Sequence, residues 1–585
     1  MIRTTRLFTM LLIALFLLAT SYHGQAIAVE SNDELSAKKD ALLLDLRGLE
    51  TMTMKLEKPL PQALAKTEIA GAAWPLDKTW AEKLLRDAYE LTFPAEEGRA
   101  RLRNQPVGAP LVVPTALDVA RNNIRNRVLT IATRDQAFAD QLAQLGAQQL
   151  GKAEARSNYT NLAAQAIRAN NYDTAGDYIL KAIDADPTVI NTGFVILDVA
   201  TQDRKAADQL IIQYIERLRT TPLTDDTAFR VFFNLQNLVF PSENFVRMGH
   251  LLTNNNDATR PPQPILPAGP AVIRAYVSYV LESLSQLEQR EPGSVMNLRG
   301  FLLATWLPLR QYAPELTGKF MELERLSRRP GENVALPTPG SAKESTREDY
   351  EQRLKAALDS DRPDETIIYL AISHGDFAKA RKLIAKLPDG GQKAQLTDEV
   401  NTREALSLAA KGDLPGAQRL AEQLTKATSM LQVYPTLIGV CSKNKDQACA
   451  AALVYQAMKQ IKSADITPAL PPAGLPAPSV ATSREFDPIL LSLNQLAKAM
   501  LPINESLAFV VLDEMVRAAN ASELDTGLGR TGFDADVFKQ FAVHNEAHTR
   551  QAAETFKDPL RQIVALAAIY QQQAMQLAKQ TEVSP

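Results

Sequence analysis

Two histidines near the carboxyl end have the spacing at which one helix presents two ligands to a metal ion. His544 and His548 are four residues apart, so a continuous helix places both imidazoles on one face. Glu546 lies between them, whereas the metalloprotease motif has glutamate directly after the first histidine. No third ligand is evident. The pair is therefore a weak candidate for a metal site, and the alternative is two exposed histidines on a polar helix.

A second pattern has the glycine spacing of dinucleotide-binding loops. Gly527, Gly529 and Gly532 match G-x-G-x-x-G, but that motif needs a buried strand directly before it and a helix directly after it. A helical pattern ending near Asn520 and a polar connector precede it here. The chain also has no G-x-S-x-G, Walker or C-x-x-C motif. We therefore expect no cofactor and no enzymatic activity.

The chain has two cysteines, Cys441 and Cys449. On one continuous helix their Cα atoms lie about 12 Å apart, which is too far for a disulfide. The intervening residues 442–447 read Ser-Lys-Asn-Lys-Asp-Gln, which is typical of a turn between two helices and lets the ends meet. In an exported protein such a pair is oxidised more often than free. The sequence thus predicts a structural disulfide.

The segments that carry these residues have helical periodicity almost throughout. A representative stripe recurs at steps of three and four: Ile273, Val277, Val280, Leu284 and Leu287. Such a stripe must be buried against another helix. Alternating strand patterns are nearly absent. The pattern predicts an all-α chain.

Three proline-rich stretches interrupt this pattern, because proline lacks a helical donor and clashes with the preceding turn. We place boundaries there. The expected order is a signal peptide at 1–28, an N-terminal helical region at 29–253, a Pro-rich loop at 254–270, a helical region at 271–326, a linker at 327–346, a helical-repeat region at 347–465, a Pro/Ala-rich loop at 466–482 and a C-terminal helical region at 483–585.

One segment has a more specific pattern. Residues 156–189 place large and small residues at the positions where two helices cross closely, and a proline closes the unit: Tyr159, Leu162, Ala163, Ala175, Ala182 and Pro187. This segment resembles a tetratricopeptide repeat, a helix pair of about 34 residues. Residues 374–387 and 411–424 resemble its loop and second helix. The resemblance implies helical hairpins stacked as an irregular TPR-like α-solenoid. The alternative is a set of irregular hairpins without a common groove.

The same helix phase suggests where a partner binds. Four polar residues lie off the apolar stripe of the first helix of this unit: Asn158, Asn161, Gln165 and Arg168. If the array has a groove, these are the expected liners.

The amino terminus has the three parts of a secretory signal. A basic start is followed by the apolar run from Leu7 to Ala19 and by Ala26-Ile27-Ala28, a small-x-small cleavage pattern. The apolar run is too short for a membrane span. We therefore expect a mature chain from about Val29, periplasmic or extracellular, without a membrane span.

Composition narrows the class of partner. Removing Arg3 and Arg6 with the signal leaves 62 basic residues against 67 acidic ones, a net charge of −5. Nucleic acid is a poor fit, because phosphate binding needs a clustered positive field. We expect an exported scaffold that binds a protein or peptide, with its oligomeric state left open. The alternatives are a self-assembling structural component of the cell envelope and, less favoured, a metal-binding enzyme using His544 and His548.

Overall fold

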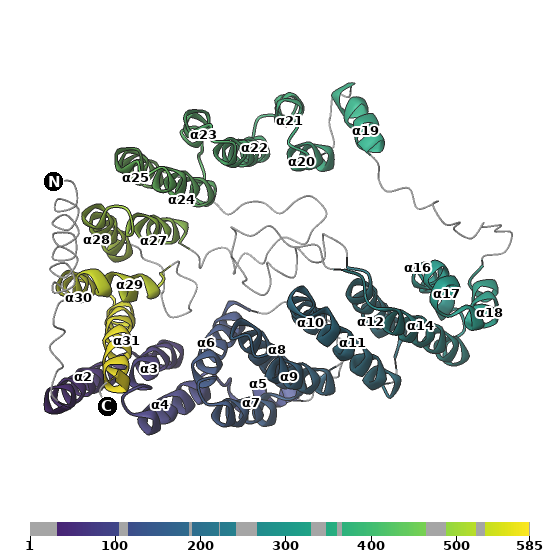
Figure 1. The fold of residues 1–585 in the computed structure, drawn as a ribbon, viewed down its shortest axis with the longest axis horizontal. Coiled ribbons are helices and arrows are strands. Elements are labelled where there is room, and N and C mark those ends of the chain that lie inside the picture. The colour runs from purple at the N-terminus through teal and green to yellow at the C-terminus, as the bar shows by residue number, and fades with distance from the viewer. Residues whose placement is uncertain are drawn as a thin grey trace, which may run out of the picture.

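The chain is all-α, with helical hairpins stacked side by side in a solenoid-like array (Figure 1). A computed structural model describes residues 32–103, 115–186, 190–221, 223–241, 266–328, 347–359, 365–463, 487–521 and 533–583, and no strand occurs in these ranges. The predicted signal peptide, the linker from 329, the Pro/Ala-rich loop, most of the Pro-rich loop, Pro187 and the glycine motif at 527–532 lie outside them.

The first part of the chain forms one continuous row of helices in Figure 1, drawn from purple to teal. Its elements are α2 (Asn32–Thr53), α3 (Pro59–Ala73), α4 (Lys78–Leu91), α5 (Glu96–Arg103), α6 (Ala116–Ala132), α7 (Gln136–Leu150), α8 (Lys152–Arg168), α9 (Tyr172–Ala185), α10 (Ile190–Gln202), α11 (Arg204–Arg219), α12 (Asp225–Val239), α14 (Pro270–Arg290), α15 (Ser294–Asn297), α16 (Arg299–Ala304), α17 (Trp306–Tyr312), the 3₁₀ helix η1 (Pro314–Leu316) and α18 (Thr317–Ser327).

The second part runs back along the other side of the molecule, drawn from green to yellow. Its elements are α19 (Arg347–Asp359), α20 (Glu365–Ser373), α21 (Phe377–Ala385), α22 (Gly391–Ala410), α23 (Leu414–Ala421), α24 (Ala427–Lys443), α25 (Gln447–Ile461), α27 (Pro488–Met500), α28 (Glu505–Ala521), α29 (Asp536–His544), α30 (Glu546–Glu554) and α31 (Pro559–Val583).

Four hairpins turn in the same way. The first helix ends in a residue with positive φ, and an Asn or Asp then begins the second helix, at 170–171, 375–376, 412–413 and 445–446. In each turn the amide of that Asn or Asp donates to the carbonyl five residues earlier, at 2.9 Å. This bond satisfies a carbonyl that the end of the helix leaves unpaired. These four hairpins therefore share one turn geometry, and the repeat-like pattern in the sequence included three of them.

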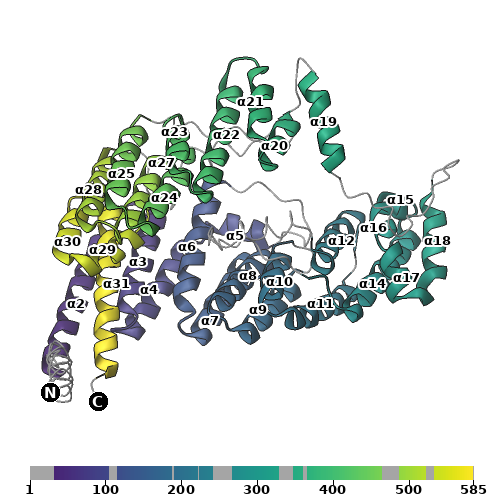
Figure 2. The ribbon, with the colours of Figure 1, turned by 45° about the horizontal axis from the view of Figure 1, so that its top comes forward.

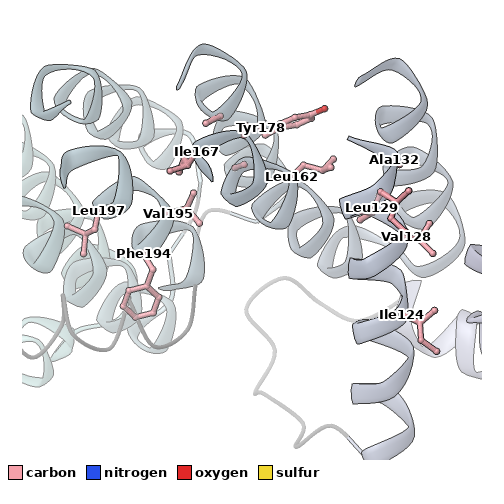
Figure 3. Packing of buried hydrophobic residues seen from close by; sticks show 14 of the residues in the cluster. Ile124, Val128, Leu129, Ala132, Leu162, Ile167, Tyr178, Phe194, Val195 and Leu197 are labelled. Atoms are coloured by element: carbon pink, nitrogen blue, oxygen red, sulfur yellow. The ribbon is translucent and has the colours of Figure 1, made fainter. Parts of the chain in front are cut away.

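The hairpin of α8 and α9 packs as the spacing predicts. Leu162 and Ala163 of α8, and Ala175 and Ala182 of α9, have no exposed surface. Figure 3 shows Leu162 and Ile167 pointing into the cluster that also contains Val128 and Leu129 of α6. Short side chains at the crossing let the helices approach, so the apolar stripe continues from one hairpin to the next.

The last helix returns to the start of the chain. α31 packs against α2 and α3 (Figure 2). The Gln571 side-chain amide donates to the Gly71 carbonyl at 3.3 Å, and a Cβ on Gly71 would lie 3.2 Å from Ile131. Glycine at position 71 of α3 therefore leaves room for Ile131 of α6. One buried cluster has members from Leu42 to Ala574, so the two ends of the chain share a core. Within the described residues, a second cluster lies between Leu354 and Val400.

The helix ends can be compared with the expected boundaries. α14 begins at Pro270, the last residue of the expected Pro-rich loop, since proline fits the first turn of a helix. α18 ends at Ser327, the first residue of the expected linker, and α19 begins at Arg347, directly after it. Among the described helices, none combines the length and apolar character that a membrane span needs.

Candidate binding groove

A groove of about 480 Å³ lies along the exposed sides of α6, α8 and α10. α8 packs against both α6 and α10, and its apolar stripe is occupied by these contacts and by α9. The opposite side of α8 is therefore left to line the groove. The lining consists of Asn123, Asn126, Arg127 and Thr130 of α6, of Arg156, Ser157, Thr160, Asn161, Ala164, Gln165 and Arg168 of α8, and of Phe194 and Val195 of α10.

The groove contains three of the four predicted liners. Asn161, Gln165 and Arg168 all line it. The Gln165 amide donates to Thr130 Oγ1 at 3.1 Å and so links α8 to α6. Arg168 ends α8 and is exposed. The helix phase read from the sequence therefore placed these three side chains on one surface.

The fourth predicted liner, Asn158, is in the core, and this prediction was wrong. Its side chain is 1% exposed, and its Nδ2 donates to Tyr89 Oη at 2.9 Å. A Cβ on Gly146 of α7 would lie 2.7 Å from the same Nδ2. The reason is that Asn158 comes three residues after Ala155 and four before Leu162, both buried, and so lies on the apolar stripe of α8 itself.

Two polar atoms in the groove wall lack partners. Thr160 Oγ1 and Asn161 Nδ2 are buried and have no hydrogen bond within the described residues. An unmade hydrogen bond of this kind costs about 1–3 kcal/mol. A ligand with both a donor and an acceptor, such as a peptide group, would recover it.

The charge of the lining is positive. It includes Arg127, Arg156 and Arg168, and none of its residues is acidic. Arg127 binds Glu68 through two hydrogen bonds of 2.9 and 3.0 Å, and the charge of Glu68 raises the pKa of Arg127. Arg156 lies 3.1 Å from Asp186. Glu68 and Asp186 therefore partly compensate the charges of Arg127 and Arg156.

Sequence reasoning missed the contributions of α6 and α10. Nothing in the order of residues says which exposed helix faces will lie beside α8, and the polar run Asn122–Asn123 with Arg121 and Arg125 is equally typical of a solvated face. The lining also includes no Cys, His, Asp or Glu. It therefore offers hydrogen-bond donors, acceptors and an apolar part at Phe194 and Val195, rather than a nucleophile with a base.

The histidine pair is arranged differently from the expectation. His544 is the last residue of α29, Asn545 has an extended conformation (φ −147°), and His548 lies in α30. The two imidazoles therefore do not share a helix face. His544 Nδ1 lies 3.4 Å from Glu505, and His548 Nε2 lies 3.2 Å from Asp513.

His548 also stacks on Phe509, at 4.5 Å between ring centres. Each histidine thus faces its own carboxylate. Within the described ranges, no group of three or more His, Cys, Asp or Glu side chains is placed to hold a metal ion.

The two cysteines meet across a turn. Cys441 is in the last turn of α24 and Cys449 in the first turn of α25. Their sulfurs are 2.06 Å apart and their Cα atoms 5.9 Å. Asp446 begins α25 and accepts a bond of 2.9 Å from the Cys449 amide. The disulfide therefore joins the two helices of one hairpin, and in the sequence it is far from the groove residues.

Comparisons with known proteins add little to these observations. No family model matches the sequence, and no curated protein matches it. Among solved structures, one described as a circular tandem repeat protein with novel repeat topology and enhanced subunit contact surfaces covers 92% of this chain and 99% of its own. Its sequence identity is 12% and its TM-score 0.14. A TM-score this low does not show a common fold, so the fold class rests on the helices described above.

Proposed function

We propose that this chain is an exported binding scaffold without catalytic activity, and that the groove of α6, α8 and α10 holds an extended segment of another protein. The observation that carries the proposal is the groove itself: three adjacent helices expose amides, hydroxyls and arginines along one hollow. Extended peptide offers a carbonyl and an amide at each residue, and these match Asn and Gln side chains.

The unpartnered atoms strengthen this reading. Asn161 Nδ2 can donate to a peptide carbonyl, and Thr160 Oγ1 can accept from a peptide amide. Phe194 and Val195 add an apolar part to the groove wall. A site of this kind gains affinity from a few desolvated polar contacts and an apolar anchor.

Two finer features belong to the same proposal. Export is supported by the basic start, apolar run and small-x-small pattern of residues 1–28, and by the cysteine pair, since disulfides persist in oxidising compartments. A relation to tetratricopeptide repeats is supported by the pattern at 156–189 and by the small residues buried between α8 and α9.

The test is crosslinking of the tagged chain in its native compartment, followed by identification of what is recovered. Arg168→Glu reverses a charge in the groove, and Ala164→Trp fills it. Lys205→Glu, at an exposed position of α11 outside the groove, is the matched control. We expect a stoichiometric partner with the wild type and the control, and at least about a tenfold lower recovery with the groove variants.

Other outcomes redirect the proposal. Equal recovery with Arg168→Glu and Ala164→Trp would place the partner elsewhere on the molecule. Recovery of this chain alone would favour the self-assembling envelope component, and a measurement of mass in solution would then give its oligomeric state.

A further inference from the structure

A second cavity lies where the last helix meets the first ones. α3, α6 and α31, with residues 533–536 before and at the start of α29, surround about 240 Å³. Much of its wall is apolar, with contributions from Leu64 of α3, Phe533, and Leu560 and Val564 of α31. The cavity is therefore built from segments some 500 residues apart in the sequence, and it exists only when α31 packs on α3.

One charged side chain in this wall is incompletely paired. Arg561 is 3% exposed. Its Nη1 donates to the Ala519 carbonyl, and its Nε lies 3.7 Å from Asp558. Neither Nε nor Nη2 has a hydrogen-bond partner within the described residues. A guanidinium presents its donors in a planar fork that fits the two oxygens of a carboxylate.

The acidic groups at the cavity are already engaged or stand at its rim. Glu68 binds Arg127 through both of its oxygens. Asp534 forms an ion pair with Lys498 and accepts a hydrogen bond from the Asp536 amide. Asp536 itself is exposed to water, where its charge is screened. Arg561 is thus a cationic group in the wall with two donors that have no partner within the described residues.

We propose that this cavity binds a small carboxylate with an apolar body. The carboxylate meets Nη2 of Arg561, and the body packs against Leu64, Phe533 and Val564. The volume is below the roughly 300 Å³ at which sites for drug-sized ligands begin, so the bound group has on the order of ten non-hydrogen atoms. Such a group is either a free organic acid or the carboxyl-terminal apolar residue of a peptide. This proposal does not rest on an occupant of the groove, although Arg127 lines both hollows.

The first measurement is calorimetric titration of the full mature chain with three probes. These are 3-phenylpropionate as the free acid, N-acetyl-leucine as a mimic of a peptide carboxyl terminus, and 3-phenylpropanamide as an uncharged isostere of the first. We expect saturable binding of at least one acid. The affinity for the amide should be at least about tenfold lower, because a charge-assisted hydrogen bond is lost. The acid that binds more tightly identifies the source.

Variants connect the binding to the cavity. Leu64→Trp fills it, and Leu44→Trp makes the same change at an exposed position of α2 as the control. Arg561→Lys keeps the charge but removes the fork, and its folding is checked by circular dichroism. We expect Leu64→Trp and Arg561→Lys to lose at least tenfold in affinity, and Leu44→Trp to match the wild type.

Three results would each overturn the proposal. The first is the absence of saturable binding of both acids at millimolar concentration. The second is equal affinity for the acid and its amide. The third is unchanged affinity of the Leu64→Trp variant, in which the indole fills the cavity. This result does not depend on whether Arg561→Lys folds.

Discussion

Replacing Asn158 with alanine separates a structural role from a binding role on a single helix. Asn158 and Asn161 both lie on α8, three residues apart. The first is buried and bonded to Tyr89, whereas the second lines the groove with an unpartnered Nδ2. We expect Asn158→Ala to destabilise the hairpin and Asn161→Ala to leave it intact.

The magnitude follows from what the Asn158 side chain contacts. Its removal deletes the 2.9 Å bond to Tyr89, and it leaves the buried Tyr89 hydroxyl short of a partner, at about 1–3 kcal/mol. The amide group also leaves a small void between α7 and α8, which adds roughly 0.5–1 kcal/mol. Asn158 Oδ1 has no hydrogen bond within the part of the chain that the structure describes, and its loss offsets part of this cost. The net destabilisation is about 2 kcal/mol.

Hydrogen exchange measured peptide by peptide is the suitable assay, because an array of hairpins can open locally. A loss of about 2 kcal/mol corresponds to roughly thirtyfold faster exchange in α7, α8 and α9. Asn161→Ala should exchange like the wild type, since it removes a donor that has no partner. If Asn158→Ala kept wild-type protection and instead lost the bound partner, the core placement of Asn158 would be refuted.

Three further predictions concern stability. Gly146→Ala should lower the free energy of unfolding by about 1–3 kcal/mol, because the added Cβ would lie 2.3 Å from Tyr89 Oη. An unchanged midpoint of chemical denaturation would contradict this packing. Replacing Cys441 and Cys449 with serine should cost about 2–3 kcal/mol for so short a loop, and reductant should destabilise the wild type but not this variant. Burial lowers the pKa of Lys539, so its ammonium form opposes folding at neutral pH. Lys539→Met should therefore be more stable than the wild type at pH 7, by a margin that shrinks as the pH rises toward the ordinary lysine pKa; a constant margin would rule out this cause.

Local sequence was sufficient for the fold class and for the hairpin turns. The stripe of Ile273, Val277, Val280 and Leu284 is buried in α14 as its spacing predicts. Asp413 and Asp446 begin helices and accept hydrogen bonds from the first turn. These features depend on residues within a few positions of one another. Periodicity and capping therefore carry them without reference to the rest of the chain.

The candidate sites were predicted only in part. The phase assumed for α8 placed Asn161, Gln165 and Arg168 in the groove. It misplaced Asn158, which lies between Ala155 and Leu162 on the buried stripe of the same helix. His544 and His548 have the spacing of a helix face, yet Asn545 ends one helix and begins the next. Spacing gives a common face only when the helix is continuous, and an Asn between the two residues is a signal against that continuity.

The sequence by itself determined that the chain is helical, where four of its hairpins turn, and which three residues of α8 lie on its polar side. These depend on propensity, capping and a period of 3.6 residues. Only the tertiary structure decided which helices lie beside one another. The union of α6, α8 and α10 forms the groove, and the packing of α31 on α3 brings Leu64 and Arg561 around one cavity. The physical reason is that burial of an apolar stripe does not depend on which partner covers it, so the pairing of helices distant in sequence is set by their shapes in the folded chain.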